Sequence, residues 1–444
     1  MTYASAITEL FALGQELATP AGGPLRKFDI EHMRTLVAAL RHPERRFPSV
    51  LIAGTNGKGS TSATLASIFH TAGYRTGLYT SPHLVQVNER IQIDGAPIGD
   101  AEFSETYARV DDVARELVAK GGLKLHPSFF EMMTAMAFEY FARSNIEIAV
   151  LEVGMGGRLD ATNVVEPCVS VITDIALDHQ QFLGHTLAEI AREKAGIIHA
   201  NSLLVTLPQH PDANDVIGGV AMERGARAVS AADYVPDVSP NRQSPTALSN
   251  GGYSLNIMGD EVLIESPLVG RHQLRNVALA ISAAEQLNNC GFRITPAQIA
   301  EGVRKTKWRG RFQLIPGEPD FILDVAHNPA GAWALRSTLS ECCDGRPLTI
   351  IFGAMRDKAL GEMAELLFPL ADHIVLTQSH SMRAASAEEI RVAAGEVATE
   401  AMVEATVAGA IQRAREVSDK NGVVVITGSI YIVGEALSIL QTRA

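Results

Sequence analysis

VLIAGTNGKGSTS, at residues 50–62, is the most informative stretch of the chain. Its first four residues read as a buried strand, the glycine-rich run 54–59 as a turn, and the residues from Ser60 as a helix. Backbone N–H groups of such a turn can surround an anion, and the helix N-terminus adds partial positive charge. Lys58 can reach the outer phosphates of a nucleotide, and the Ser60 hydroxyl can bind Mg²⁺. The stretch therefore predicts a phosphate-binding loop.

The spacing of this loop departs from the usual G-x-x-x-x-G-K-[ST] pattern. Ile52 stands where the first glycine is expected, and Gly59 separates Lys58 from Ser60. A glycine-rich turn with a solvent-facing lysine is the structural alternative. The order of strand, glycines, lysine and serine favours a nucleotide site over that alternative.

Length and composition limit the class of protein. A chain of 444 residues suggests two or three domains, and 46% hydrophobic with 20% charged residues is typical of globular proteins. The net charge of −12, without a long basic run, argues against nucleic-acid and anionic-membrane partners. The four cysteines show no C-x-x-C pair, which fits a reducing cytoplasm, and no apolar run is long enough to span a membrane.

Strand and helix patterns alternate along the chain. Two helices are expected before the loop, at 4–17 and 30–40, and after it strands alternate with helices, which predicts parallel βαβ units. The region 236–252 reads as an irregular excursion or a loose hairpin. A second alternation begins near Trp308. We therefore predict an α/β protein with an N-terminal P-loop ATPase domain on a parallel sheet, residues 1–306, and a C-terminal Rossmann-like α/β domain, residues 307–444. The expected elements between the loop and the second alternation are the strands 76–79, 146–153 and 169–173, and the helices 60–72, 129–142, 187–195 and 275–287.

Two polar positions follow buried strands of the first domain. Glu152 ends the strand IAVLE, and Asp178 and His179 follow the strand at 169–173. Ligands collect at the carboxyl ends of strands in open α/β sheets, so these side chains can share a crevice with the phosphate loop. Taken alone, Glu152 is equally well read as a solvated carboxylate, and His179 as a capping or core residue.

Lys194 lies on the apolar face of the helix LAEIAREKAG. Leu187, Ile190 and Ala191 recur at helical spacing, and Lys194 falls on the same face. Burial disfavours the ammonium form, and a neutral lysine amine can add CO₂ to become an anionic carbamate. A lysine in the last turn that hydrogen-bonds helix-end carbonyls is the alternative.

Several motifs together resemble the folate branch of the Mur ligase family, the dihydrofolate synthase and folylpolyglutamate synthase enzymes. The motifs are GTNGKGS, SPHLVQVNER, LEVGMGGRLDATN, ALDH, AREKAG, GRFQ, DVAHNP and TGSIYIVG. The resemblance implies a ligase that uses ATP to add L-glutamate to dihydropteroate, to (tetrahydro)folate or to both through an acyl phosphate. No motif of the family matches the region 236–252.

The resemblance also implies roles for single residues. The catalytic residues would be Lys58, Lys194 and His327. Two Mg²⁺ ions are expected, with Mn²⁺ also compatible, on Ser60, Glu152, His179 and a carbamylated Lys194. The expected ATP contacts are Thr55, Asn56, Gly57, Lys58, Gly59, Ser60, Thr61, Asn276 for the adenine, Arg311 for the phosphates and Asp324 for the ribose.

The expected pteridine and glutamate contacts are Ser81, Arg90, Phe130, Asp160, His327 and Ser429. Phe130 can stack on the pteridine ring, and Asp160 can accept hydrogen bonds from its amino-pyrimidine edge. Phe130 is also consistent with a plain core position. Asn328 can cap a helix that has Pro329 as its first residue.

Two other functions stay open at this point. A muramyl-peptide ligase is the first, although the short segment before the loop leaves no room for a UDP-sugar domain. A nucleotide-dependent switch protein that ligates nothing is the second. In the reading we favour, the protein is a cytoplasmic monomer with small-molecule substrates.

Overall fold

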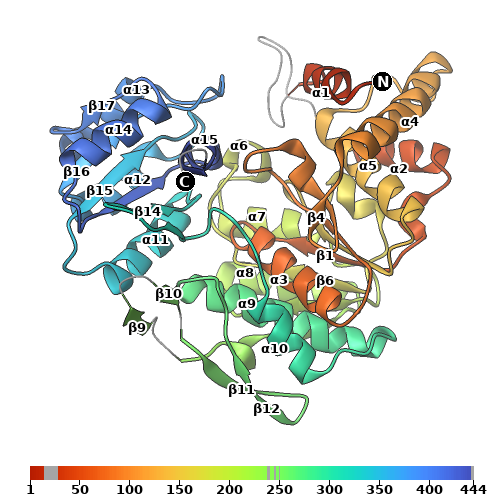
Figure 1. The fold of residues 1–444 in the computed structure, drawn as a ribbon. Coiled ribbons are helices and arrows are strands. Elements are labelled where there is room, and N and C mark those ends of the chain that lie inside the picture. Colours follow the sequence, from red (N-terminus) through yellow and green to blue (C-terminus); the bar gives the residue numbers. More distant parts are fainter. Residues whose placement is uncertain (15–28, 238–240, 245–246, 250, 442–444) are drawn as a thin grey trace.

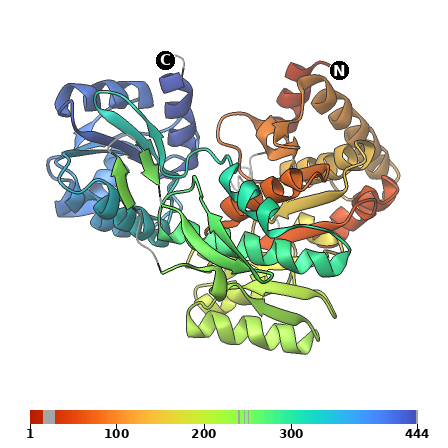
Figure 2. The ribbon, with the colours of Figure 1, turned by 60° about the horizontal axis from the view of Figure 1, so that its bottom comes forward.

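The computed structural model describes residues 1–14, 29–237, 241–244, 247–249 and 251–441. Two α/β units lie side by side, each built on its own sheet (Figure 1, Figure 2). The predicted fold class is therefore confirmed. The predicted division after residue 306 falls between the last helix packed on the first sheet and the first strand of the second, and as a domain boundary it stays a prediction.

The first sheet has eight strands, with β1 near its centre. From β2 to β8 all pairings are parallel, whereas β3 and β4 add antiparallel at one edge. Their order across the sheet is β4 (Ala96–Pro97), β3 (Ile91–Ile93), β2 (Thr76–Tyr79), β5 (Ile148–Glu152), β1 (Ser49–Ala53), β6 (Val169–Ile172), β7 (Leu203–Thr206) and β8 (Arg227–Ser230).

Residues 50–53 of strand β1 are all apolar because the strand is buried on both faces of the sheet. Leu51 and Ala53 belong to one buried cluster and Val50 and Ile52 to the other, because successive side chains point to opposite faces of the sheet. The first cluster is covered by α1 (Tyr3–Ala12), α2 (Ile30–Ala39), α4 (Asp100–Ala119), α5 (Phe129–Arg143), α7 (Leu187–Ala195) and α8 (Pro211–Glu223). The second is covered by α3 (Lys58–Thr71), α9 (Arg271–Leu287) and α10 (Pro296–Arg304).

Some predicted boundaries differ from the structure. Helix α3 begins at Lys58 rather than Ser60, because Gly57 has a φ of 88° and turns the chain directly into the helix. The predicted helix 4–17 corresponds to α1, which ends at Ala12, and its last residues lie outside the described ones. The region 236–252 contains the antiparallel pair β9 (Asn241–Ser244) and β10 (Ala247–Ser249), followed by the hairpin β11 (Tyr253–Ile257) and β12 (Asp260–Ile264).

The second sheet has six strands and is covered on both faces. Only β13 is antiparallel to its neighbour. The order is β13 (Gln313–Ile315), β14 (Asp320–Leu323), β18 (Val423–Thr427), β15 (Leu348–Phe352), β16 (His373–Leu376) and β17 (Met402–Val403). One face carries α11 (Pro329–Cys342), α12 (Leu360–Leu367) and α13 (Ala387–Ala394), and the other α14 (Val407–Val417) and α15 (Ile430–Gln441).

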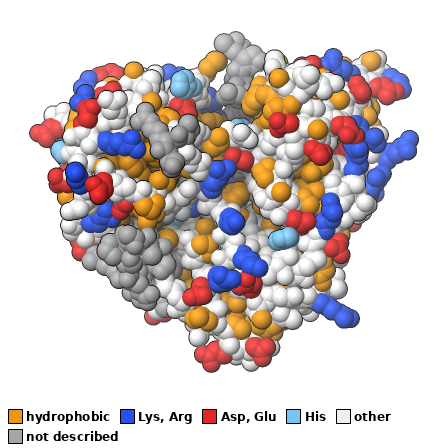
Figure 3. Space-filling model, viewed as in Figure 1, with side chains coloured by type: hydrophobic (Ala, Val, Ile, Leu, Met, Phe, Trp, Pro, Cys, Tyr) orange, Lys and Arg blue, Asp and Glu red, His pale blue; other side chains and the backbone are white. Residues whose placement is uncertain are grey.

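Basic and acidic side chains are interspersed over the face seen in Figure 3, so the negative net charge is not gathered there into one patch. Within the described part of the chain, no helix combines the length and the apolarity that crossing a membrane requires.

Candidate nucleotide and ligation site

The phosphate loop is held tightly at the carboxyl end of β1. The backbone N–H groups of Thr55 and Asn56 donate to the Asp174 carbonyl, at 2.9 and 3.2 Å. Gly54 has a φ of 152°, and a Cβ there would lie 1.8 Å from Thr173 Oγ1. A Cβ on Gly57 would lie 2.1 Å from Asn276 Oδ1. Both glycines are required, because a side chain at either position would collide with the neighbouring element.

Lys58 folds back over its own loop. Its Nζ donates to the carbonyls of Gly54 and Thr55, at 3.1 Å each. Burial lowers the pKa of this amine, and the negative charges of Glu152 and Asp178 act in the opposite direction. The amine therefore lies against the loop. A glycine-rich turn with a solvent-facing lysine, the structural alternative, would place it in solvent.

Ser60 carries a hydroxyl without a partner. The residue is 1% exposed, and its Oγ has no hydrogen-bond partner among the residues that the structure describes. A buried polar atom without a hydrogen-bond partner is destabilising, and this indicates that a ligand binds the Ser60 hydroxyl. Glu152 is also buried and accepts a hydrogen bond from the Ser81 N–H at 3.2 Å. A hydroxyl and a carboxylate are the hard oxygen ligands that Mg²⁺ prefers, so these two residues fit the ion.

His179 lies at the start of α6 (Gln180–Leu183) with a left-handed φ of 49°. Burial lowers its pKa to about 3, so the imidazole is neutral and keeps a lone pair for a metal. In the described part of the chain, no three His, Cys, Asp or Glu side chains form a ready metal site. The predicted metal set contains only two such side chains, and it needs Ser60 and a modified Lys194 to be complete.

Lys194 is buried, as its helical position predicts, and is 5% exposed. Its Nζ donates to the Gly54 carbonyl at 2.6 Å, so it contacts the phosphate loop rather than the carbonyls at the end of its own helix. Burial and then the charge of Lys58 lower its pKa well below the ordinary value. Two lysine amines thus converge on one carbonyl of the loop.

The second sheet presents its own polar residues at the carboxyl ends of its strands. Asp324 accepts hydrogen bonds from the N–H groups of Phe312 and Ala326, both at 2.9 Å. Burial lowers the pKa of Arg311, while Asp324 and Glu152 act to raise it, so the guanidinium lies within electrostatic reach of both units. This placement is compatible with the predicted phosphate contact of Arg311.

Asp178 joins the two units. Its carboxylate accepts from Lys358 Nζ at 2.6 Å and from Asn328 Nδ2 at 3.2 Å, and His327 Nε2 lies at 3.5 Å. Asn328 also exchanges amide hydrogen bonds with Asn56 of the phosphate loop, at 2.9 and 3.3 Å. Burial alone would raise the pKa of Asp178, but the hydrogen bond from His327 and the nearby positive charges hold it below its ordinary range.

Sequence reasoning missed Lys358. It belongs to the segment after β15, in the run GAMRDK, and its side chain is 7% exposed in the ion pair with Asp178. Its position after a buried strand was the one available signal, since nothing local in the sequence identifies its partner 180 residues away.

The predicted substrate residues of the first unit gather near β5. The half-buried Phe130 ring packs on Gly154, where a Cβ would lie 2.4 Å from the ring, and its centroid lies 6.1 Å from that of Tyr79. Asp160 accepts hydrogen bonds from Met155 N–H at 2.9 Å and from Thr162 N–H at 3.0 Å, so it also stabilises its own turn. Their substrate contacts stay predictions.

Three other predicted residues, Arg90, Asn276 and Ser429, have defined local contacts, and their roles stay predictions. Arg90 is buried, donates from Nε to His83 Nδ1 at 3.0 Å, and lies 5.0 Å from the centre of the Phe129 ring. Asn276 is buried, and its Nδ2 donates to Gln273 Oε1 at 2.9 Å. Ser429 is placed just before α15, where its Oγ accepts from the Ile432 N–H at 3.3 Å. His83 is a polar neighbour that sequence reasoning missed.

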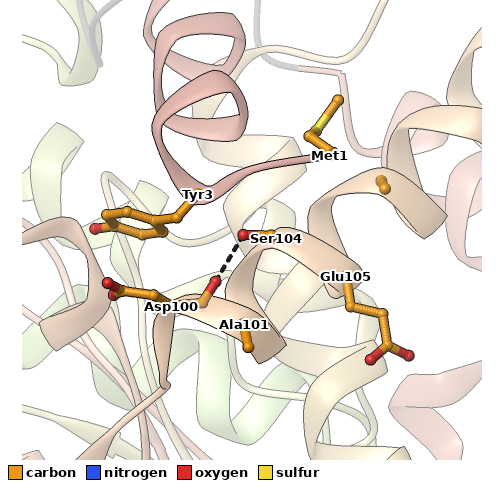
Figure 4. Close-up of a pocket in the computed structure, with 7 residues that line it drawn as sticks. Met1, Tyr3, Asp100, Ala101, Ser104 and Glu105 are labelled. Atoms are coloured by element: carbon orange, nitrogen blue, oxygen red, sulfur yellow. Dashed lines mark hydrogen bonds between the residues drawn. The ribbon is translucent and has the colours of Figure 1, made fainter.

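A separate pocket of about 490 Å³ lies between the start of α1 and α4 (Figure 4). Tyr3, Asp100 and Ser104 are among its lining residues, and Ser104 Oγ donates to the Asp100 carbonyl at 2.6 Å. None of the predicted site residues lines this pocket. The candidate site is therefore the polar region around the phosphate loop, where the two units meet.

Comparison with known proteins agrees with this geometry. Residues 126–284 match the Mur ligase middle domain, and residues 310–430 match the Mur ligase glutamate ligase domain. The dihydrofolate synthase/folylpolyglutamate synthase of Bacillus subtilis is 36% identical over 409 residues, which cover 91% of this chain and 93% of that protein. A probable bifunctional folylpolyglutamate synthase/dihydropteroate synthase of Halobacterium salinarum is 37% identical, and the chain spans 49% of its length.

Solved structures show the same similarity over the whole chain. The folylpolyglutamate synthase of Mycobacterium tuberculosis, complexed with ADP and AMPPCP, has a TM-score of 0.88 and 31% identity, with 99% of each chain covered. Escherichia coli FolC in complex with DHPP and ADP has a TM-score of 0.85 and 27% identity, with 100% of this chain and 98% of that chain covered.

The fold, the phosphate loop and these similarities define the class: the chain belongs to the Mur ligase family, whose matched models cover both of its units. Within that family it is an ATP-dependent amino acid ligase of the dihydrofolate synthase and folylpolyglutamate synthase type.

Proposed function

We propose that this protein joins the amino group of L-glutamate to the free carboxylate of dihydropteroate, of a folate or of both, while ATP is converted to ADP and phosphate. The observation that carries the proposal is the phosphate loop itself, where Lys58 and Lys194 meet at the Gly54 carbonyl beside the unpartnered hydroxyl of Ser60. The buried Lys58 amine and a hydroxyl that has no partner among the described residues, at one glycine-rich turn, suit a polyphosphate and its metal ions better than they suit a folded core.

A carboxylate is a poor electrophile, so the reaction requires activation. Transfer of the γ-phosphoryl group of ATP to the pteridine carboxylate gives an acyl phosphate and ADP. The amine of glutamate then attacks the acyl carbon, the C–O bond to phosphate breaks, and an amide and inorganic phosphate result. In this scheme Lys58 and Arg311 offset the negative charge that develops on the transferred group.

The residues of the chain would hold the nucleotide between the two units. Asn276 packs on Gly57 of the phosphate loop and is proposed to contact the adenine. Asp324 and Arg311 come from the second unit, and we assign them to the ribose and the phosphates. Because the ligands come from both units, closure of one unit on the other would complete the site and exclude water.

Ser60, Glu152, His179 and a carbamylated Lys194 are proposed to hold Mg²⁺, with two ions expected and Mn²⁺ also compatible. When bound, the ions would offset phosphate charge and orient the γ-phosphoryl group. Lys194 must be anionic for this purpose, because an ammonium group would repel a cation. Its burial favours the neutral amine that adds CO₂.

The other two substrates are the pteridine and L-glutamate. We assign the pteridine contacts to Phe130, Asp160, Ser81 and Arg90, and the glutamate contacts to His327 and Ser429. His327 lies beside Asp178 at the junction of the two units, where we propose that the acyl phosphate meets the amine. A cytoplasmic location and a monomeric state complete the proposal.

Release of ADP tests this function. With purified protein and Mg²⁺, ADP should form only when L-glutamate and either dihydropteroate or tetrahydrofolate are both present. Comparing the two acceptors separates dihydrofolate synthase from folylpolyglutamate synthase activity. Equal turnover with a UDP-muramyl peptide would favour the muramyl alternative, and ADP release that ignores every acceptor would favour the switch protein.

A further inference from the structure

Trp308 contacts the phosphate loop from the segment that connects the two units. It lies between α10 and β13, and its half-buried ring packs against the apolar cluster under α3 and α9. A Cβ placed on Gly59 would lie 2.9 Å from Cζ2 of the indole and 3.2 Å from its Nε1. The nitrogen-bearing edge of the ring therefore faces the first turn of α3, where the loop becomes the helix.

The indole N–H has nothing to bind in the described structure. Trp308 Nε1 is closed off from solvent and has no hydrogen-bond partner among the described residues. An indole nitrogen can only donate, and buried tryptophans usually place this N–H on an acceptor. Ser60 Oγ, one residue beyond Gly59, is unpartnered in the same way. Two unpaired polar atoms beside one glycine of a phosphate loop indicate a shared ligand that is rich in acceptors.

A second residue of the connecting segment supports the same reading. Arg311 lies within electrostatic reach of Glu152 and Asp324, whereas Arg309 pairs with Glu89 at 3.2 Å. The connecting segment therefore brings two donor groups that are three residues apart, the Trp308 indole N–H and the Arg311 guanidinium, toward the region of the phosphate loop. A tryptophan that served only to anchor the segment would need its apolar ring but not its N–H.

We propose that the Trp308 indole N–H donates a hydrogen bond to an oxygen of the bound nucleotide, and that this contact ties nucleotide binding to the segment joining the two units. The inference rests on the proposed placement of the nucleotide at the phosphate loop. A hydrogen bond to a charged phosphate oxygen is stronger than one to a neutral acceptor, and it would satisfy a donor that has no partner among the described residues.

Replacement of Trp308 by phenylalanine tests the proposal, because Phe keeps an aromatic ring and removes the N–H. Titration calorimetry should show the Kd for ADP rising about tenfold in Trp308→Phe, as expected for loss of one charge-assisted hydrogen bond. The KM for ATP should rise with it, whereas the KM values for glutamate and dihydropteroate should stay within about twofold. The matched control is Trp333→Phe, since Trp333 is the other of the two tryptophans and is 61% exposed on α11; it should leave every constant unchanged.

Fluorescence gives a second readout, which reports whether nucleotide binding reaches the surroundings of this indole. In Trp333→Phe the only indole left is that of Trp308, so ADP should change its emission with the same Kd as calorimetry. An unaltered ADP affinity in Trp308→Phe would overturn the proposal, and so would a parallel rise of all three KM values with a lowered Tm. Failure of the unchanged protein to bind ADP would instead count against the placement of the nucleotide at the loop, and hence against the proposed function.

Discussion

The carboxyl edges of the two sheets carry similar residues but use them differently. At the first edge, Ser60 Oγ has no partner in the part of the chain that the structure describes, and Lys58 and Lys194 both donate to the Gly54 carbonyl. These polar groups are therefore available to a ligand. At the second edge, Asn328 and Lys358 are committed to residues of the first unit. We therefore propose that the first edge binds the ligand and that the second edge closes on it.

The largest effect should come from the first edge, through Lys194→Arg. Arginine keeps the positive charge of an unmodified lysine but cannot become a carbamate, so kcat for ADP release should fall on the order of 10²-fold or more. Arg192→Lys, on the exposed side of the same helix, is the control. Lys194→Ala leaves space in which acetate can stand in for the carbamate, and we expect partial rescue. Near-normal kcat in Lys194→Arg would refute the carbamate.

The second-largest effect should come from the ion pair between Asp178 and Lys358, which joins the two units. Lys358→Met leaves the Asp178 carboxylate buried without its ammonium partner, which typically costs about 3–5 kcal/mol. We expect a lowered Tm in thermal unfolding together with reduced kcat. Asp178→Asn combined with Lys358→Met should lose less than the two single changes added together, because the charge that remains is then removed. Additive losses would show that the pair is not coupled, and the exposed Lys305→Met serves as the control.

Asp160→Ala tests whether this carboxylate of the first unit contacts the pteridine or only stabilises its own turn. If the carboxylate contacts the pteridine, the KM for dihydropteroate should rise strongly while the Kd for ADP changes little. The hydrogen bonds to Met155 and Thr162 would also be lost, so Tm must be measured beside it. A lowered Tm with unchanged KM and kcat would show that Asp160 only stabilises its own turn and does not contact the pteridine. Exposed Asp212→Ala is the matched control.

The smallest effect should follow from Arg309→Ala. Its ion pair with Glu89 crosses between the units but is solvent-accessible, with Arg309 48% exposed. Such pairs contribute about 0.5 kcal/mol, and salt screens them. We expect Tm to move little and kcat to stay near normal in ADP-release assays. If Tm and kcat fall as far as in Lys358→Met, the junction depends on the exposed Arg309–Glu89 pair rather than on the buried Asp178–Lys358 pair.

Local signals account for much of what could be predicted. Strand β1 is buried on both faces, so its sequence is a plain apolar run, and the glycines after it mark a turn that no side chain fits. Lys194 was predicted to be buried from helical spacing alone, and this is confirmed. The start of α3 was placed two residues late, because a left-handed glycine starts the helix before any periodicity is visible.

Patterns within a few residues were therefore enough to predict the class of fold, the glycine-rich turn after β1 and the buried face of α7, because backbone geometry and burial constrain the residues of one element directly. The pairing of Asp178 with Lys358, the contact of Asn56 with Asn328 and the position of Trp308 over Gly59 join residues 180, 272 and 249 positions apart. No local pattern can encode such pairs. The first two pairs arise only when the two sheets bring their carboxyl edges together, and the third arises when the segment that joins the units packs on the first one. We propose that the ligation site lies at this junction.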